Sequence, residues 1–240
     1  MRKQAQAVLI AAATSLACPV GGALAGEAPK LAPRLDEAPF APLMDQGFAA
    51  VKASKPAEAL AIFAGIDEKF AAAYAAGPRV YCSHNARETL VNMTRAAADN
   101  QDAISIGGTW CDAIYFEAYT LIDLGRPADA ASELDRALKM SPDNPQYLNE
   151  RAELLTQARH MDEALAMFKQ AEAHHSYMDA EAAALVVQSR SCRGIGYVLT
   201  EQGKLDESEA NYRRCLTLDP VDQKSKDELA YIAQLRQKKK

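Results

Sequence analysis

The chain has 240 residues, of which 49% are apolar, so it is long enough to form one or two domains with a buried core. Its 27 basic and 32 acidic residues give a formal net charge of -5. A net negative chain has no general attraction for phosphate backbones, which argues against nucleic acid as a partner. Aromatic residues are only 7%, and no long run alternates apolar and polar residues. We therefore expect an all-α protein with essentially no sheet.

Residues 1–25 have the features of a secretory signal peptide. Arg2 and Lys3 supply a positive start, residues 7–20 form an apolar core, and small residues precede a cleavage site after Ala25. An apolar core of about 14 residues is too short for a transmembrane helix, which needs about 20. We therefore expect no membrane span and an exported, periplasmic protein.

Cys18 supports a second interpretation of this segment, because a lipid-modified cysteine also follows a short apolar stretch. Such signals carry a leucine-like residue three positions earlier, where this chain has Ser15. The alternative is therefore an outer-membrane lipoprotein anchored at Cys18.

The next two segments precede the clearest pattern in the chain. Residues 26–41 contain three prolines and little periodic apolar content, which predicts an extended linker. Residues 42–109 are an N-terminal helical region, in which residues 43–70 predict a degenerate helical hairpin. Within the same region, residues 77–109 predict one helix and a loop.

A pattern close to 34 residues long recurs between residues 110 and 220. Gly125 and Pro142 are seventeen positions apart, and so are Gly203 and Pro220. Counting the turn glycine as position 15, the three units start at Cys111, Pro145 and Ser189. Positions 8 and 20 are small in every unit, and position 24 is large and apolar. In unit order, these residues are Ala118, Ala152 and Gly196, then Ala130, Ala164 and Ser208, then Leu134, Phe168 and Tyr212.

This pattern resembles the tetratricopeptide repeat, a helical hairpin whose period and small–large pairs match. The second unit departs from it, with Arg159 in place of the turn glycine. The resemblance implies a right-handed superhelical solenoid of antiparallel helix pairs. The third unit starts ten residues late, so we expect residues 178–202 to form an extended first helix. Residues 221–240 predict a capping helix with a short basic tail.

A solenoid of this kind implies binding of a protein or peptide partner in a concave groove. The first helix of each unit, helix A, should expose positions 2, 5, 9, 12 and 13 there, because these lie opposite its packed positions. Tyrosine and arginine concentrate binding energy at interfaces, and asparagine could bond a peptide backbone. The candidate groove residues are Tyr115, Tyr119, Asn149, Arg190, Arg193 and Tyr197.

Four cysteines remain after the predicted signal peptide, at positions 82, 111, 192 and 215. An even number in an exported chain is compatible with disulfides. Cys192 and Cys215 lie toward the same end of the third hairpin and are a candidate pair. Both also face the helix interface, where free cysteines pack as small apolar groups, so the two states stay open.

The sequence contains no recognisable catalytic, metal-binding or cofactor-binding motif. Its four histidines are never four residues apart on one helix, and no phosphate loop or nucleophile elbow occurs. We therefore predict a non-catalytic interaction scaffold or assembly factor of the cell envelope, without metal or cofactor. The alternative is an envelope hydrolase or redox enzyme that uses residues 77–109, with Cys82 and His84 as its candidate groups.

Overall fold

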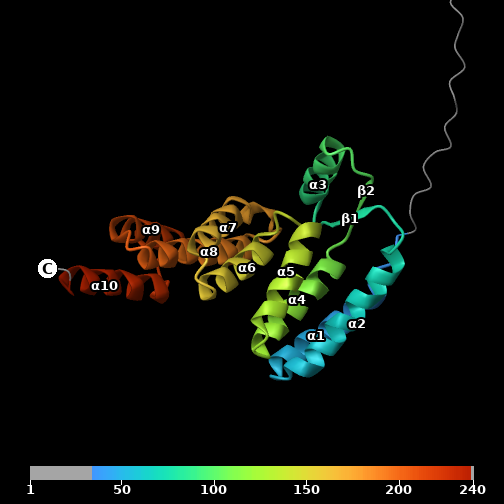
Figure 1. The fold of residues 1–240 in the computed structure, drawn as a ribbon, viewed down its shortest axis with the longest axis horizontal. Helices are drawn as coiled ribbons and strands as arrows, with labels where there is room; N and C mark the ends of the chain where they lie inside the picture. The colour runs from blue at the N-terminus through green and yellow to red at the C-terminus, as the bar shows by residue number, and fades with distance from the viewer. Residues whose placement is uncertain (1–33, 239–240) are drawn as a thin grey trace, which may run out of the picture. The chain divides into compact units, whose positions relative to one another are not determined.

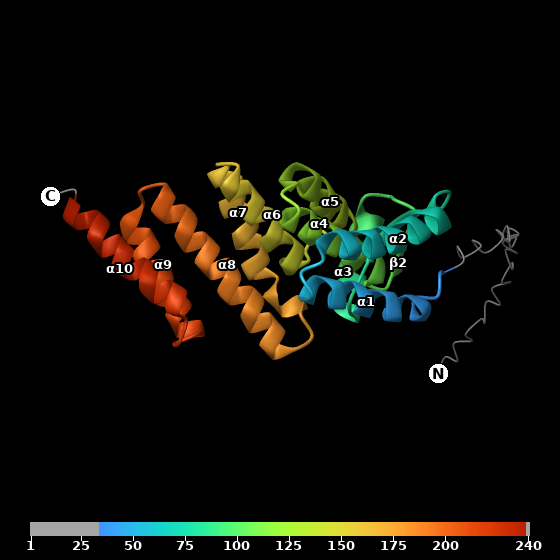
Figure 2. The same ribbon diagram turned by 90° about the horizontal axis from the view of Figure 1, so that it is seen from below.

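The computed structural model of the protein describes residues 34–238. The predicted signal peptide, Cys18 and most of the predicted linker lie outside the described residues, as do the last two lysines of the tail. Within the described part, successive helical hairpins pack against one another in chain order (Figures 1 and 2). This part of the chain is an all-α solenoid with one small insertion.

Four helical hairpins and a final helix make up the solenoid. The final helix, α10, covers the last hairpin. The hairpins are α1 (Ala41–Lys52) with α2 (Pro56–Tyr74), α4 (Thr109–Asp123) with α5 (Pro127–Met140), α6 (Pro145–Gln157) with α7 (Met161–Ala173), and α8 (Glu181–Glu201) with α9 (Leu205–Leu218); α10 is Gln223–Lys238. The first pair is the degenerate hairpin, and the other three are the units that start at Cys111, Pro145 and Ser189.

The turns follow from local backbone chemistry. Gly125 and Gly203 have φ angles of +71° and +72°, a left-handed conformation that glycine adopts without steric cost. Arg159 occupies the same turn position in the second unit and has a φ angle of 65°. The turn therefore has the same left-handed conformation although its residue is not glycine. Pro127 and Pro145 stand at the first positions of their helices, where the missing N–H costs nothing.

The hairpins close where the small residues meet. Ala118 and Ala130 are fully buried in the first unit, and so are Ala152 and Ala164 in the second. In the third unit a Cβ added to Gly196 would lie 2.6 Å from the ring of Tyr212. The small positions therefore let two helices approach while the large residue at position 24 fills the space beside them.

The third unit begins with a longer helix, as its late start predicts. The surplus residues form a short 3₁₀ turn, η2 (His175–Tyr177), followed by α8, which is 21 residues long. Its first two turns precede the repeat unit, which starts at Ser189. These turns bring Val187 against α6, where its carbonyl accepts a hydrogen bond from Asn149.

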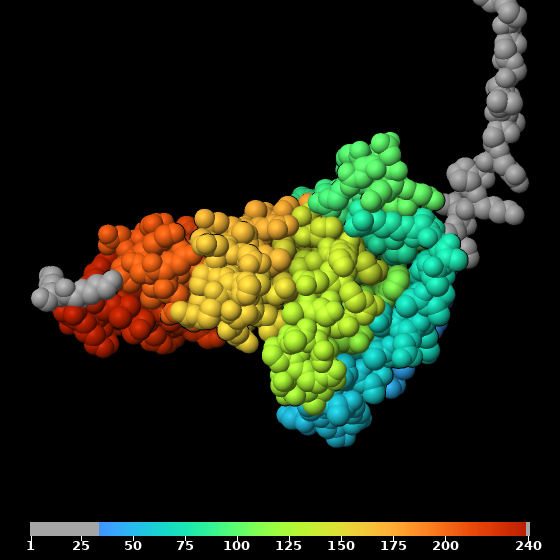
Figure 3. All heavy atoms as spheres, viewed as in Figure 1, coloured from blue at the N-terminus to red at the C-terminus, as the bar shows by residue number. Residues whose placement is uncertain are grey.

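Residues 77–109 contain the one expected helix, but two short strands flank it in a small βαβ unit, so the expectation of a loop without sheet was wrong. Strands β1 (Arg79–Cys82) and β2 (Ala103–Ile106) pair in parallel, with α3 (Ala86–Ala98) as their crossover (Figure 1). Strands of four residues are too short to show a clear alternating pattern. We call residues 79–106 the βαβ insertion; it protrudes beside the first repeat in the space-filling view (Figure 3).

The described end of the predicted linker is also not extended. Residues 38–40 form a 3₁₀ turn, η1 (Ala38–Phe40), that leads directly into α1. The Phe40 ring is buried against Phe70, with ring centroids 4.7 Å apart. The Glu37 carboxylate accepts a 2.6 Å hydrogen bond from the backbone N–H of Gly107. The packing of Phe40 on Phe70 and the hydrogen bond between Gly107 and Glu37 therefore attach this end of the linker to the solenoid.

Candidate partner-binding groove

Three of the six candidate groove residues, Arg190, Arg193 and Tyr197, line a cavity of ≈ 600 Å³. This cavity, which we call the α8 pocket, lies between helix A of the second unit, helix A of the third unit and α10. Six of its lining residues occupy predicted inner positions of helix A. The full lining is Glu153, Thr156 and Gln157 of α6, Phe168 of α7, Arg190, Arg193, Gly194 and Tyr197 of α8, Tyr212 of α9, and Lys224 and Glu228 of α10.

Two of the six candidate groove residues are not available to a partner, which corrects their assignment. Tyr115 is only 4% exposed; its hydroxyl lies 3.3 Å from Glu150, and its ring stacks on Tyr147. Asn149 is fully buried, because its side chain bonds to Val187 and Ser191 of α8. Both side chains join neighbouring units to each other, a role that helical periodicity alone does not separate from groove lining.

The other four candidates keep access to solvent. Tyr119 and Tyr197 hold the same repeat position in the first and third units, and they are 37% and 40% exposed. Arg190 is fixed by Glu150 at 2.8 Å and Glu153 at 2.6 Å. Arg193 has one acidic contact, with Asp222 at 3.4 Å. Only Tyr119 lies outside the α8 pocket lining.

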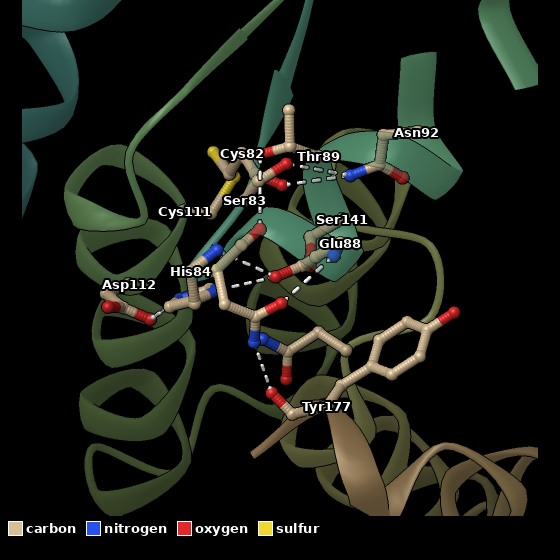
Figure 4. Close-up of polar contacts among 12 residues, drawn as sticks. Cys82, Ser83, His84, Glu88, Thr89, Asn92, Cys111, Asp112, Ser141 and Tyr177 are labelled. Atoms are coloured by element: carbon tan, nitrogen blue, oxygen red, sulfur yellow. Dashed lines mark hydrogen bonds and ion pairs between the residues drawn. A yellow bond between two sulfur atoms is a disulfide. The ribbon is translucent and has the colours of Figure 1, made fainter. Parts of the chain in front are cut away.

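The βαβ insertion contacts the first inner position of the first unit. His84 lies between two carboxylates, 3.1 Å from Glu88 and 3.1 Å from Asp112 (Figure 4). Asp112 holds inner position 2 of the first unit, and it also accepts a 2.6 Å bond from the hydroxyl of Tyr147. The first two inner side chains of this unit, Asp112 and Tyr115, are therefore bonded to the protein itself, whereas Tyr119 is open to solvent.

The charge state of His84 follows from this arrangement. Burial opposes its charge, but the hydrogen bonds and charges of Asp112 and Glu88 outweigh burial and raise the pKa of His84 to about 10. Burial opposes the charge of Glu88 as well, but the hydrogen bonds and charge of His84, with the hydrogen bond of Ser141, lower the pKa of Glu88. The raised pKa of His84 favours the charged imidazolium form at neutral pH.

Further contacts attach the insertion to later repeats. Asn85 donates a 2.7 Å hydrogen bond to the carbonyl of Tyr177 in η2. Arg95 bonds to Asp143, between α5 and α6, at 2.6 Å. The side chain of Ser141 donates to the buried carboxylate of Glu88. These contacts could not be predicted from the sequence, because the residues that they join are up to 92 positions apart along the chain.

Both cysteine pairs are disulfides in the structure. Cys82 is bonded to Cys111, which attaches the end of β1 to α4 (Figure 4). Cys192 is bonded to Cys215 across the α8–α9 hairpin. Their Cα atoms are 6.1 and 5.7 Å apart, within the usual range for disulfides. A bonded Cys82 has no thiolate, so in this oxidation state it is not the nucleophile of a hydrolase.

Two further features of the described residues bear on function. No helix there is long and apolar enough to cross a bilayer. No group of three or more histidine, cysteine or acidic side chains among residues 34–238 is placed to hold a metal ion.

Comparison with known families decides the identity of the repeats. Residues 117–180 match the tetratricopeptide-repeat family, and residues 189–222 match it again. The second match begins at Ser189, which is also the first residue of the third unit when its turn glycine is counted as position 15. The chain is a tetratricopeptide-repeat protein. No curated protein matches its sequence.

Solved structures share this fold at low sequence identity. The kinesin light chain of Podosopora anserina, with nearly identical TPR-like repeats, has a TM-score of 0.57 and 10% identity, covering 85% of this chain and 90% of its own. The MamA RS-1 ArsTM double mutant has a TM-score of 0.53 and 15% identity, covering 84% and 86%. At these identities the likeness establishes that this tetratricopeptide-repeat protein shares their solenoid fold.

Proposed function

We propose that the protein is a non-catalytic scaffold or assembly factor of the cell envelope. It binds a segment of a partner protein on the inner face of its second and third repeats. The supporting observation is the α8 pocket, a solvent-accessible cavity lined by helix A residues of two repeats and by the capping helix. Tetratricopeptide repeats are interaction modules, and their stacked A helices supply an extended concave surface.

We place binding at this part of the groove because two inner side chains of the first unit are already engaged. Asp112 bonds to His84 and Tyr147, and Tyr115 contacts Glu150. In the later units, Thr156, Gln157 and Tyr197 line open space. The net charge of -5 favours a protein or peptide partner over nucleic acid.

Site-specific photo-crosslinking in intact cells tests the groove. A photoreactive phenylalanine at Tyr197 should yield a defined adduct with a partner protein. The same group at Lys169, an exposed residue of α7 outside the pocket lining, should not yield that adduct. Equal adducts at both sites, or none at Tyr197, would refute partner binding on the inner face.

Export to the periplasm, with cleavage after Ala25, is part of the same proposal. Two disulfides support it, because disulfides persist in oxidising compartments and are rare in the cytosol. N-terminal sequencing of the mature protein distinguishes the two interpretations of residues 1–25, a cleaved signal peptide and a lipoprotein signal. A start at Gly26 supports a free periplasmic protein, whereas an acylated Cys18 supports the lipoprotein alternative.

A further inference from the structure

The βαβ insertion contacts three successive repeats, although it precedes all three units in the sequence. It is joined to the first unit by the disulfide between Cys82 and Cys111 and by the contact of His84 with Asp112 (Figure 4). Its other contacts lie at the junction of the first and second units and at the connection between the second and third. In a solenoid each repeat ordinarily contacts only its neighbours, so the insertion adds links of longer range.

The last turn of α3 holds the junction of the first and second units. Arg95 bonds to Asp143 at 2.6 Å, and Asp143 is only 8% exposed. The other carboxylate oxygen of Asp143 accepts a 3.3 Å hydrogen bond from Gln170 of α7. The insertion is therefore bonded, through one buried carboxylate, to both units that meet at this junction.

The opposite end of α3 reaches the connection between the second and third units. Asn85 caps this helix, because its side-chain oxygen accepts a 3.0 Å hydrogen bond from the N–H of Glu88. Its amide nitrogen donates to the carbonyl of Tyr177 at 2.7 Å. Arg87 donates a 3.1 Å hydrogen bond to the hydroxyl of Ser176. Since the cap already orients Asn85, its bond to η2 costs little further side-chain entropy.

The connection that α3 reaches is longer than the one between the first and second units, and it has little packing of its own. It comprises residues 174–180, seven residues, against four in residues 141–144. No residue of η2 is buried. A longer connection without buried side chains opens more readily than a packed one. The hydrogen bonds from Asn85 and Arg87 therefore restrict a segment that, with the packing of α8 on α7, places the third unit.

We propose that the βαβ insertion is a strap that limits movement of the third repeat relative to the first. Its disulfide and Asp112 anchor it to the first unit, and Asn85 and Arg87 hold η2. Release of η2 lets the third hairpin change its angle to the second. This inference stands independently of the proposed function, because it concerns the motion of the repeats and not what they bind.

A distance measured between the two repeats tests the strap. Spin labels are carried on unnatural amino acids at Ser132 of α5 and Glu207 of α9, both exposed, so that the disulfides stay intact. Asn85→Ser with Arg87→Ala should broaden the distance distribution between the labels, measured by double electron–electron resonance, and shift its mean. Serine caps a helix about as well as asparagine does, so α3 keeps its cap while the bonds to η2 are lost.

Arg79→Ala is the matched control for this double variant. Arg79 is also an exposed arginine of the insertion, but it donates to the carbonyl of Lys139 in the first unit. Its loss should leave the distance distribution as narrow as in wild type. Thermal unfolding of each variant establishes that it is folded.

Hydrogen exchange supplies a second readout at the connection itself. In Asn85→Ser with Arg87→Ala, the amides of η2 and of the first two turns of α8 should exchange about tenfold faster, as loss of one or two hydrogen bonds predicts. The amides of α9 should keep their wild-type rates, because the third hairpin moves without unfolding.

The strap is supported only when both readouts change in the double variant and neither changes in Arg79→Ala. Unchanged distances overturn it even where η2 exchanges faster, since the insertion would then hold η2 without restraining the third repeat. Unchanged exchange also overturns it, because η2 would not have been released. Equal broadening in Arg79→Ala overturns it as well, because the effect would not depend on the bonds to η2.

Discussion

The hydroxyl of Ser208 donates a hydrogen bond of 2.8 Å to the backbone carbonyl of Gly196. These residues are positions 20 and 8 of the third repeat, the places at which the two helices approach most closely. In the first repeat the same positions are Ala118 and Ala130, both fully buried. Close contact of small residues is therefore the feature on which the repeat geometry depends.

Gly196→Ala should destabilise the protein, because the added methyl group would lie 2.6 Å from the Tyr212 ring. Overpacking of this kind costs about 1–3 kcal/mol, which urea unfolding measures. Gly65→Ala is the matched control, since nothing lies within 4 Å of a Cβ there. That change sits inside α2 and should stabilise by about 0.5–1 kcal/mol, because alanine loses less entropy than glycine in a helix. Equal effects at both sites would contradict the packing explanation.

How much the sequence predicts depends on whether a feature is periodic. The small residues Ala118, Ala130 and Gly196 recur at fixed places, so their packing and the start of each repeat could be predicted. The extra length of α8 followed from the late start of the third unit. Burial of Asn149 could not be predicted, because it depends on Val187, which lies in the non-periodic surplus before that unit.

The βαβ insertion shows the opposite case. Its strands have four residues each, too few for a period, and their pairing joins Arg79 to Ala103 across a whole helix. The disulfide partner of Cys82 lies 29 positions away, beyond that insertion. One signal was present in the sequence, namely an even number of cysteines, but spacing alone does not choose among the possible pairings.

The disulfides predict a specific labelling result. Alkylation of the mature, denatured protein without reductant should modify none of the four cysteines outside the signal peptide, and reduction should expose all four to the reagent. Mass spectrometry of proteolytic fragments should find Cys82 linked to Cys111 and Cys192 linked to Cys215.

Loss of either crosslink should lower stability, since a disulfide restricts the unfolded chain. Loops of 29 and 23 residues correspond to about 3 kcal/mol each in the loop-entropy account. Cys82→Ser with Cys111→Ser, and Cys192→Ser with Cys215→Ser, separate the two contributions in urea unfolding. Labelling of all four thiols in the unreduced wild type would contradict both assignments.

Glu117 predicts a loss of stability as pH rises. Burial, together with the carboxylates of Asp67 and Glu133, raises the pKa of Glu117 to about 8, and one of its oxygens is buried without a hydrogen-bond partner. The folded state therefore keeps a proton that the unfolded state releases near pH 4.5. The stabilisation is complete below pH 4.5 and is lost as pH rises to about 8.

Glu117→Gln should remove this dependence, because glutamine keeps the shape without the charge. The variant should be more stable than wild type at pH 9, by on the order of a few kcal/mol, with a much smaller difference at pH 4. Glu207→Gln changes an exposed carboxylate of α9 and should show no such trend. Melting temperatures measured between pH 4 and pH 9 test this prediction. Parallel plots of melting temperature against pH for wild type and Glu117→Gln would contradict the raised pKa of Glu117.

His84 predicts a pH dependence over a higher range. Its pKa is raised to about 10 in the folded protein, against 6.5 in the unfolded chain, so protonation favours folding. The stabilisation is complete below pH 6.5 and is lost as pH rises through about 10. His84→Gln should therefore destabilise most at pH 6 and progressively less toward pH 10.

The effect of His84→Gln should also be local. Hydrogen exchange should increase in α3 and η2, because Asp112 and Glu88 lose the cation that holds the insertion to the first repeat. His160→Gln is the control, because the side chain of His160 is exposed and has a single polar contact, Glu163 at 2.9 Å. If the two variants lose equal stability at pH 6, the charge on His84 does not help to attach the βαβ insertion to the repeats. The insertion would then be held by its disulfide and by the contacts of Asn85 and Arg95.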